Sequence, residues 1–302
     1  MPRDPARPAP WAERPLLLDG GLGSSLIARG LPLGMPPERW NLEQPQQVGA
    51  VHRSFAEAGS DVLHTNSFGA NPPKLAAGGL AGLCRELNGA AVRLARDAAA
   101  SARPGILIAG DIGPTGLLLP PLGPASEDEL QRAFREQAEI LAEAGADLLS
   151  IETMFDLREA QAALAAARTT GLPVLVSLTF ERKRRGFFTL MGDPLLPALQ
   201  ALAARGAAAV GFNCTVESPT MVEMAQLVRG GLTVPLVAQP NAGQPRATPA
   251  GVVYDADPEQ FARDLMRLVV EGARLVGGCC GTDERFLAAA RRALDAELPA
   301  LA

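Results

Sequence analysis

The stretch EAGADLLSIE, residues 143–152, ends one helix and begins one strand. Gly145 is suited to a helix C-cap, and the short apolar run that follows it closes on a carboxylate. The same order recurs in EAGSD at 57–61 and in EGARL at 271–275. A chain that repeats helix, glycine and strand is typical of an α/β fold with parallel strands.

Eight short apolar runs of this kind are spread along the chain. They are LLLD (16–19), DVLHTN (61–66), ILIAGD (106–111), DLLSIE (147–152), PVLVSLT (173–179), AAVGFNC (208–214), PLVAQPN (235–241) and RLVGGCC (274–280). Their polarity does not alternate, which is expected for strands that are covered on both faces. Their spacing leaves room for a crossover helix after each strand, since a βαβ unit takes about 30 residues or more.

We therefore predict an α/β fold with a single (β/α)8 TIM barrel over residues 14–302, preceded by a disordered lead-in over residues 1–13. A doubly wound open sheet is the alternative. That fold would need a phosphate-binding glycine loop after the first strand, and DGGLGSS (19–25) does not fit G-x-G-x-x-G.

Capping patterns and two insertions complete the outline. Asp257 before Pro258 and Ser126 before three acidic residues predict helix starts. The insertions are the Pro/Gly-rich segment 112–125 and the segment 181–193, whose charge run we expect to be a solvated loop.

Composition excludes several classes of function. The 302 residues are 47% hydrophobic with a net charge of −5, so a basic surface for nucleic acid is not expected. The first dozen residues lack an apolar signal region, and no run approaches the ~20 residues that span a bilayer. We expect a cytoplasmic protein without membrane or nucleic-acid partners. Four cysteines are too few for a disulfide scaffold, and two histidines make a His-rich metal site improbable.

Functional residues of a barrel gather at the carboxyl ends of its strands. In chain order these ends carry Asp19, Asn66, Asp111, Glu152, Thr179, Cys214, Asn241 and the pair Cys279-Cys280. The sixth and eighth strands thus bring three thiols toward one patch, and the seventh places Asn241 between them. Cys84 belongs to a helical stretch, where we expect it to be a small buried side chain.

Three thiols suit zinc, because three protein ligands leave the fourth position open. Zn²⁺ with three thiolates carries a net charge of −1 and is a poor Lewis acid for splitting water. It can still hold a fourth thiol as a thiolate near pH 7. The pattern favours alkyl transfer to a thiol over hydrolysis. A redox dithiol at Cys279-Cys280 and a non-catalytic zinc- or partner-binding barrel are the alternatives.

Seven blocks of the chain, in order, resemble those of the homocysteine S-methyltransferase family, from about residue 15 to residue 292. They are LLLDGGLGSSL, DVLHTNSFGAN, DIGPTG, SIETMFDLREA, GFNCT, QPNAG and VGGCCGT. TNSFGAN and ETMFD are most similar to the homocysteine-binding module of cobalamin-dependent methionine synthase. The resemblance implies zinc bound by Cys214, Cys279 and Cys280, with the homocysteine thiol as fourth ligand. It also implies that the amide oxygen of Asn241 fills that position when substrate is absent.

The remaining strand ends are candidates for the rest of the substrate. Asp19 and Glu152 match acidic family residues near substrate, and a carboxylate is what the ammonium group of homocysteine needs. Gly20 and Gly21 would let backbone N–H groups reach the substrate carboxylate. Asn66 also lies on this side and is a further substrate-binding candidate, although we favour a loop-ordering role for it.

Asn213 has the same expected role of ordering a loop. We expect His64 to be a buried core histidine and His52 to lie on a helix surface.

These residues together predict a zinc-dependent S-methyltransferase that converts homocysteine to methionine. All eight strands are used in one barrel, so we expect the methyl donor to come from outside it. The donor is either a small molecule, such as S-methylmethionine, or a corrinoid protein that docks in trans. One tyrosine and two tryptophans supply an aromatic cage only sparsely, which disfavours betaine. A family member that acts on another thiol or a selenol is the alternative.

Overall fold

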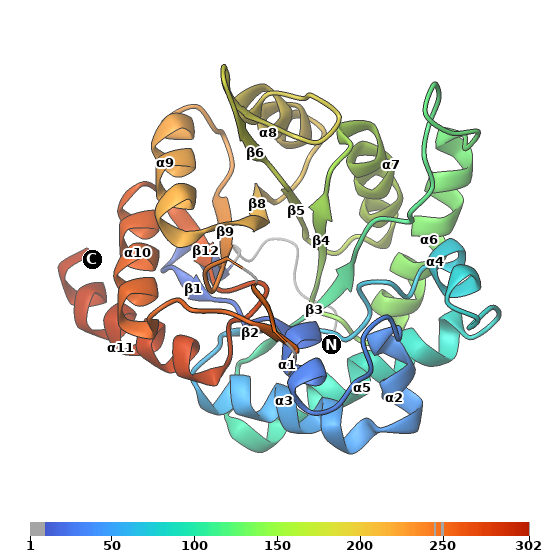
Figure 1. Cartoon of the computed structure of the whole chain (residues 1–302), viewed down its shortest axis with the longest axis horizontal. Helices are drawn as coiled ribbons and strands as arrows, with labels where there is room; N and C mark the ends of the chain where they lie inside the picture. Colours follow the sequence, from blue (N-terminus) through green and yellow to red (C-terminus); the bar gives the residue numbers. More distant parts are fainter. Residues whose placement is uncertain (1–9, 245, 249–250, 302) are drawn as a thin grey trace.

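The computed structural model of the chain describes residues 10–244, 246–248 and 251–301. Its main sheet has eight parallel strands and curves into a barrel (Figure 1). The strands are β1 (Leu16–Leu17), β2 (Val62–His64), β3 (Leu107–Ile112), β4 (Leu148–Met154), β5 (Val174–Leu178), β8 (Ala209–Glu217), β9 (Leu236–Asn241) and β12 (Ala273–Val276). The predicted (β/α)8 barrel and all eight of its strands are confirmed.

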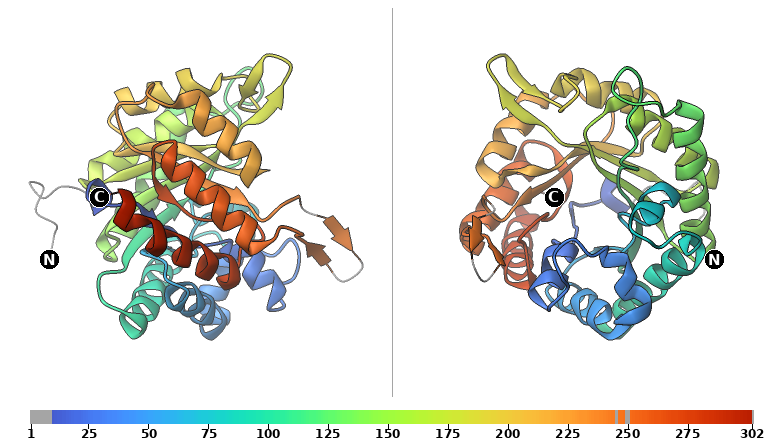
Figure 2. Two further views of the ribbon diagram at one scale, coloured as in Figure 1. Left: turned by 90° about the vertical axis from the view of Figure 1, so that its left-hand side faces the viewer. Right: turned by 45° about the vertical axis from the view of Figure 1, so that its right-hand side comes forward.

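The longer helices surround the barrel (Figures 1 and 2). They are α1 (Leu22–Ala28), α2 (Trp40–Glu43), α3 (Pro45–Glu57), α4 (Pro72–Ala77), α5 (Cys84–Ala102), α6 (Glu127–Glu143), α7 (Leu157–Ala167), α8 (Leu195–Ala204), α9 (Ser218–Val228), α10 (Pro258–Val270) and α11 (Glu284–Leu301). Short 3-10 helices are η1 (Pro10–Ala12), η2 (Pro37–Arg39) and η3 (Arg168–Thr170). The predicted caps form, since Asp257 accepts from the N–H of Gln260 and Ser126 from that of Glu129. No helix in the described part of the chain is long and apolar enough to cross a bilayer.

The predicted lead-in, residues 1–13, lies mostly outside the described residues. Its described end is ordered, because Pro10–Ala12 form η1 and the side chain of Trp11 is only 2% exposed. Trp11 belongs to the same buried cluster as Leu16 of β1. The folded part of the chain therefore includes residues ahead of the boundary at residue 14.

The insertion at 181–193 is not the plain loop that we expected. It contains an antiparallel hairpin of β6 (Glu181–Lys183) and β7 (Gly186–Phe188), which projects from the barrel (Figure 2). The guanidinium of Arg182 lies 4.6 Å from the centre of the Phe187 ring, and Phe187 is buried. This cross-strand pair explains why a charged segment forms strands. A second hairpin, β10 (Arg246–Thr248) with β11 (Gly251–Val253), was not predicted.

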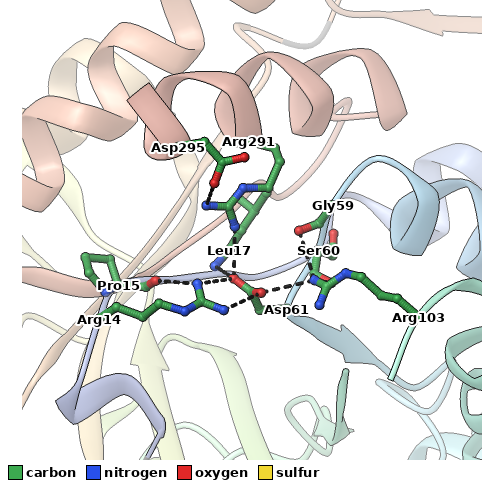
Figure 3. A network of polar contacts seen from close by, with 9 residues as sticks. All are labelled: Arg14, Pro15, Leu17, Gly59, Ser60, Asp61, Arg103, Arg291 and Asp295. Atoms are coloured by element: carbon green, nitrogen blue, oxygen red, sulfur yellow. Dashed lines mark hydrogen bonds and ion pairs between the residues drawn. The ribbon is translucent and has the colours of Figure 1, made fainter. Parts of the chain in front are cut away.

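The barrel closes between its first two strands through Asp61, at the amino end of β2. The N–H of Asp61 donates to the carbonyl of Leu17 at 2.7 Å, and its carboxylate accepts the N–H of Leu17 at 2.9 Å. Arg14, Arg103 and Arg291 form ion pairs with the same carboxylate at 2.8, 3.0 and 3.2 Å (Figure 3). Burial opposes ionisation, but the hydrogen bonds from Arg14 and Leu17 outweigh it and lower the pKa of Asp61. This end of a barrel generally serves stability.

Candidate metal and substrate site

A cavity of about 350 Å³ opens at the carboxyl ends of the barrel strands. Seven of the nine predicted site residues line it: Gly20, Gly21, Asn66, Glu152, Cys214, Cys279 and Cys280. The other two, Asp19 and Asn241, are buried and lie outside its wall. The cavity therefore lies where a TIM barrel carries its active site.

Three thiols meet at one side of this cavity. The Sγ atoms of Cys214, Cys279 and Cys280 all lie within 4.8 Å of one another, and those of Cys214 and Cys280 are 3.8 Å apart. Cys84 is distant from them in the fold, at the start of α5, where its thiol donates to the carbonyl of Ala70. Strands β8 and β12 thus bring together thiols that are 65 residues or more apart in sequence.

The backbone around the thiols is locked in an unusual conformation. Cys214 and Thr215 have φ of 58° and 62°, and Thr153 on β4 has φ of 60°. The Asn213 side chain clamps Thr153, because its oxygen accepts the Thr153 N–H at 2.8 Å and its nitrogen donates to the hydroxyl at 2.7 Å. Left-handed β-branched residues are costly and persist only where the surroundings over-determine them, often at functional sites. Asn213 therefore has the ordering role expected of it.

The ionisation of the thiols fits a metal site. Hydrogen bonds from Cys279 and Cys280 lower the pKa of Cys214 to about 3, whereas that of Cys280 is raised to about 12, chiefly through Cys214. By themselves the three groups form one thiolate and two thiol donors. A divalent cation replaces such protons and deprotonates coordinating thiols outright. Three sulfur ligands that line an open cavity could hold a metal ion and leave one of its positions open.

The end of β9 contacts the loop that carries Cys279 and Cys280. The side-chain oxygen of Asn241 accepts the N–H of Cys280 at 3.1 Å, while the N–H of Cys279 donates to the carbonyl of Pro240 at 2.8 Å. An amide oxygen has two lone pairs, so one remains for a further partner. The end of β9 therefore positions both cysteines of the loop that follows β12.

The two glycines at the end of β1 pack closely against the loop that carries Cys279 and Cys280. The N–H of Gly21 donates to the carbonyl and hydroxyl of Thr282, at 2.9 and 3.0 Å. A Cβ on Gly20 would lie 2.6 Å from the Thr282 carbonyl oxygen, and one on Gly21 only 2.5 Å from that of Cys279. Only glycine allows this approach, which holds the loop that carries Cys279 and Cys280. The N–H of Gly21 is thus engaged by Thr282, whereas we expected it to bind a substrate carboxylate.

Carboxylates from the part of the barrel that runs from β1 to β4 lie on the cavity wall or, in the case of Asp19, just outside it. Asp19 accepts from both the backbone N–H and the ring of His64, and the other ring nitrogen of His64 lies 3.1 Å from the hydroxyl of Ser150. Burial lowers the pKa of His64, but the charges of Asp19, Glu152 and Asp111 raise it to about 10. His64 is buried as expected, and it is also a cation on the cavity wall, which sequence reasoning missed.

Two other carboxyl groups of the wall hold their protons unusually well. Burial raises the pKa of Glu152 to about 7 and that of Asp111 well above its usual range, and repulsion from Asp19 adds to both. Glu152 was a predicted substrate residue. Asp111 was identified only as a polar residue at the end of a strand, with no role assigned to it. Its position at a strand end was the sequence signal that could have marked it as a site residue.

The side chain of Asn66 contacts a neighbouring loop, in keeping with the role that we favour for it, and the residue also lines the cavity. Its amide nitrogen donates to the carbonyl of Pro37 and to the side chain of Asn41, each at 2.8 Å. His52, by contrast, was expected on a helix surface and is fully buried in α3. Neither of its ring nitrogens has a hydrogen-bond partner among the described residues, and burial lowers its pKa to about 4.

Comparisons with known proteins agree on one family. The family model described as homocysteine S-methyltransferase matches residues 16–294. The methionine synthases of Mycobacterium tuberculosis and Mycobacterium leprae are each 31% identical over 287 residues, covering 90% of this chain. The chain spans about a quarter (24%) of the length of these relatives.

Solved structures give the same answer. The metallated form of the homocysteine methyltransferase MmuM from Escherichia coli matches with a TM-score of 0.78 and 28% identity, covering 93% of this chain and 97% of that one. Its oxidized form matches with a TM-score of 0.76 and 29% identity, covering 92% and 95%.

Proposed function

The chain belongs to the homocysteine S-methyltransferase family, and on that premise we propose that it transfers a methyl group to the thiol of homocysteine, giving methionine, with zinc as its metal. The observation that carries this proposal is the division of one cavity into two chemical halves. Cys214, Cys279 and Cys280 line one half, and Glu152 and Asp111 line the other. Homocysteine has a thiol at one end and an ammonium group at the other, which matches this division.

The thiol half would hold the metal through Cys214, Cys279 and Cys280. When bound there, zinc keeps a fourth, substrate thiol ionised and therefore nucleophilic near pH 7. Asn241 is the residue that we assign to the fourth position in the absence of substrate. Its side-chain oxygen accepts the N–H of Cys280 at 3.1 Å, which would keep that oxygen next to one of the three thiols that hold the metal.

The carboxylate half would bind the ammonium group. Glu152 lines the cavity, so it is our candidate for the ion pair. Asp19 was a second candidate, but both of its oxygens face His64. We therefore assign Asp19 the role of positioning His64. Fixing both ends of homocysteine aligns its sulfur for in-line attack on the methyl group, and such positioning supplies much of the rate of a two-substrate reaction.

The methyl donor is proposed to be either a small sulfonium compound or a corrinoid protein bound in trans. A cavity of about 350 Å³ is at the small end of the range for ligand sites, which suits substrates of amino-acid size. Turnover of homocysteine with methylcobalamin, S-methylmethionine and betaine, offered in parallel, separates these donors. We expect methionine with one of the first two and none with betaine.

X-ray absorption at the zinc edge tests the substrate. Adding homocysteine to the zinc-loaded protein should replace one light ligand by a fourth sulfur. The Asn241→Ala variant should show the same four-sulfur spectrum with homocysteine and a different light ligand without it. An unchanged wild-type spectrum on adding homocysteine would contradict the proposal.

A further inference from the structure

We propose that Asp111 is a second carboxylate for the substrate's ammonium group, and that it helps to select an amino thiol over a thiol without an amino group. This inference rests on the proposed function, because it concerns the same substrate in the same cavity. It adds a specificity-determining residue on β3, next to Glu152 on β4.

The sheet register places both carboxylates on the inside of the barrel. Asp111 pairs with Ser150 across β3 and β4, and paired residues of neighbouring strands point to the same side. The Ser150 hydroxyl contacts the His64 ring and so faces inward. Glu152 lies two residues further along β4, and both it and Asp111 line the cavity. The two groups are thus neighbours on one wall.

The Asp111 carboxylate lacks a partner in spite of its burial. The residue is only 7% exposed, and its Oδ1 has no hydrogen-bond donor within the described ranges. Buried carboxyl oxygens are normally hydrogen-bonded, because losing water without a replacement is costly. A ligand in the cavity would provide the missing donor.

The backbone of Asp111 is held on both sides. Its N–H donates to the hydroxyl of Thr65 at 2.9 Å, and its carbonyl accepts from the hydroxyl of Ser67 at 2.7 Å and from Gln137 at 3.4 Å. Three polar side chains therefore fix the position from which this unpartnered carboxylate reaches the cavity. Preorganisation of this kind is what a binding group needs.

The charges on the wall leave a place for one cation. The carboxylate of Asp19 is paired with His64, and that of Glu38 accepts the N–H of Gly69. No hydrogen bond to the carboxylate of Glu152 or of Asp111 is found in the described part of the chain. Two carboxylates close together resist joint ionisation unless a cation lies near both. A primary ammonium has three N–H donors and can bridge them.

Binding to the zinc-loaded protein tests this role by calorimetry. The two ligands are L-homocysteine and 4-mercaptobutanoate, which has the same thiol and carboxylate without the amino group. We expect Asp111→Asn to weaken homocysteine binding by about 10- to 100-fold, the loss typical of a hydrogen bond to a charged group. Binding of 4-mercaptobutanoate should stay within about twofold of wild type. Glu159→Gln, a buried carboxylate outside the cavity wall, is the matched control and should change neither.

Asp111→Ser, with thermal unfolding and zinc content measured alongside, keeps the test valid where the asparagine variant folds poorly. Unchanged homocysteine binding in both Asp111 variants, with a loss in Glu152→Gln, would overturn the role of Asp111 and leave the proposed function standing. Equal losses for both ligands would mean a structural role and would also overturn it. A wild-type protein that binds the two ligands equally would overturn the proposed function and this inference together.

Discussion

The carboxylate of Asp19 accepts the backbone N–H of His64 at 2.8 Å and lies 2.7 Å from its ring Nδ1. This double contact joins β1 to β2 inside the barrel and turns the far ring nitrogen toward Ser150. Each Asp19 oxygen thus has a partner in His64, and for this reason we propose a positioning role for Asp19 in place of the predicted direct contact with substrate.

The first prediction concerns the pH dependence of this pair. The pKa of His64 is about 10 in the folded protein and about 6.5 in an unfolded chain. Its contribution to stability is therefore complete below pH 6.5 and is lost as pH rises toward 10. Urea unfolding measures this effect. As pH rises from 6.5 to 9.5, the free energy of unfolding should fall by on the order of 3 kcal/mol more in wild type than in His64→Gln. Parallel pH profiles would show that His64 is not a buried cation.

The second prediction concerns barrel closure. Asp61→Asn removes the charge that three guanidinium groups share and should cost about 3–5 kcal/mol of unfolding free energy at pH 7. The control is Glu143→Gln, which breaks an exposed ion pair with Arg85 and should cost less than about 1 kcal/mol. Because the pKa of Asp61 is lowered, its contribution is present above about pH 4 and is lost as pH falls further. The difference in the free energy of unfolding between wild type and Asp61→Asn should therefore become smaller at pH 3. A larger difference at pH 3 would contradict a stabilising role for the Asp61 charge.

The third prediction concerns the buried His52. Its pKa is about 4 when folded, so the unfolded chain binds more protons between pH 4 and 6.5, and stability rises with pH over that window. His52→Leu removes this titration and keeps a similar volume. As pH falls from 6.5 to 4, the free energy of unfolding should decrease by roughly 3 kcal/mol more in wild type than in the variant. Chemical denaturation at several pH values measures this difference. Equal losses in the two proteins would mean that His52 has a polar partner or access to water.

The fourth prediction concerns the metal. Losing a residue that only hydrogen-bonds to a metal ligand typically weakens metal binding by roughly 10- to 100-fold. Cys214→Ser removes a proposed ligand itself and should weaken zinc binding by more than that. Methyl transfer should disappear while circular dichroism shows an intact barrel. Cys84→Ser is the control, since that thiol contacts the carbonyl of Ala70 and the amide of Asn88, away from the other three cysteines, and it should keep wild-type zinc content. Competition with a chromogenic chelator measures zinc binding in both variants. A redox dithiol at Cys279-Cys280 would instead show thiols that zinc does not protect from alkylation.

Local sequence patterns were sufficient for the strands and caps. The run at 147–152 forms β4 (Leu148–Met154). A short apolar segment between a glycine C-cap and a polar end has to be buried, and in a barrel the buried position of such a segment is a strand of the sheet. The run at 208–214 extends further than expected, to Glu217, since the register shifts after Asn213 where the backbone becomes left-handed. No short-range pattern encodes that shift.

Other features could have been predicted but were not. His52 lies four residues after Val48 and three before Phe55, so helical spacing already put it on the buried face of α3. The hairpin at 181–188 was not predicted, because the charged residues of this segment suggested a solvated loop. Its buried Phe187 packs under Arg182, a contact that requires the two strands to be paired first.

The sequence by itself determined that three thiols converge, because the carboxyl ends of parallel strands meet at one rim whatever the details of packing. Only the tertiary structure decided which carboxylates are free to bind a ligand. Asp19 and Asp111 both end apolar runs and are equivalent as patterns. They differ because Asp19 lies against His64, 45 residues away, whereas Asp111 meets no donor within the described residues. Hydrogen-bond partners are set by contacts across the closed barrel, and those contacts exist only once the chain has folded.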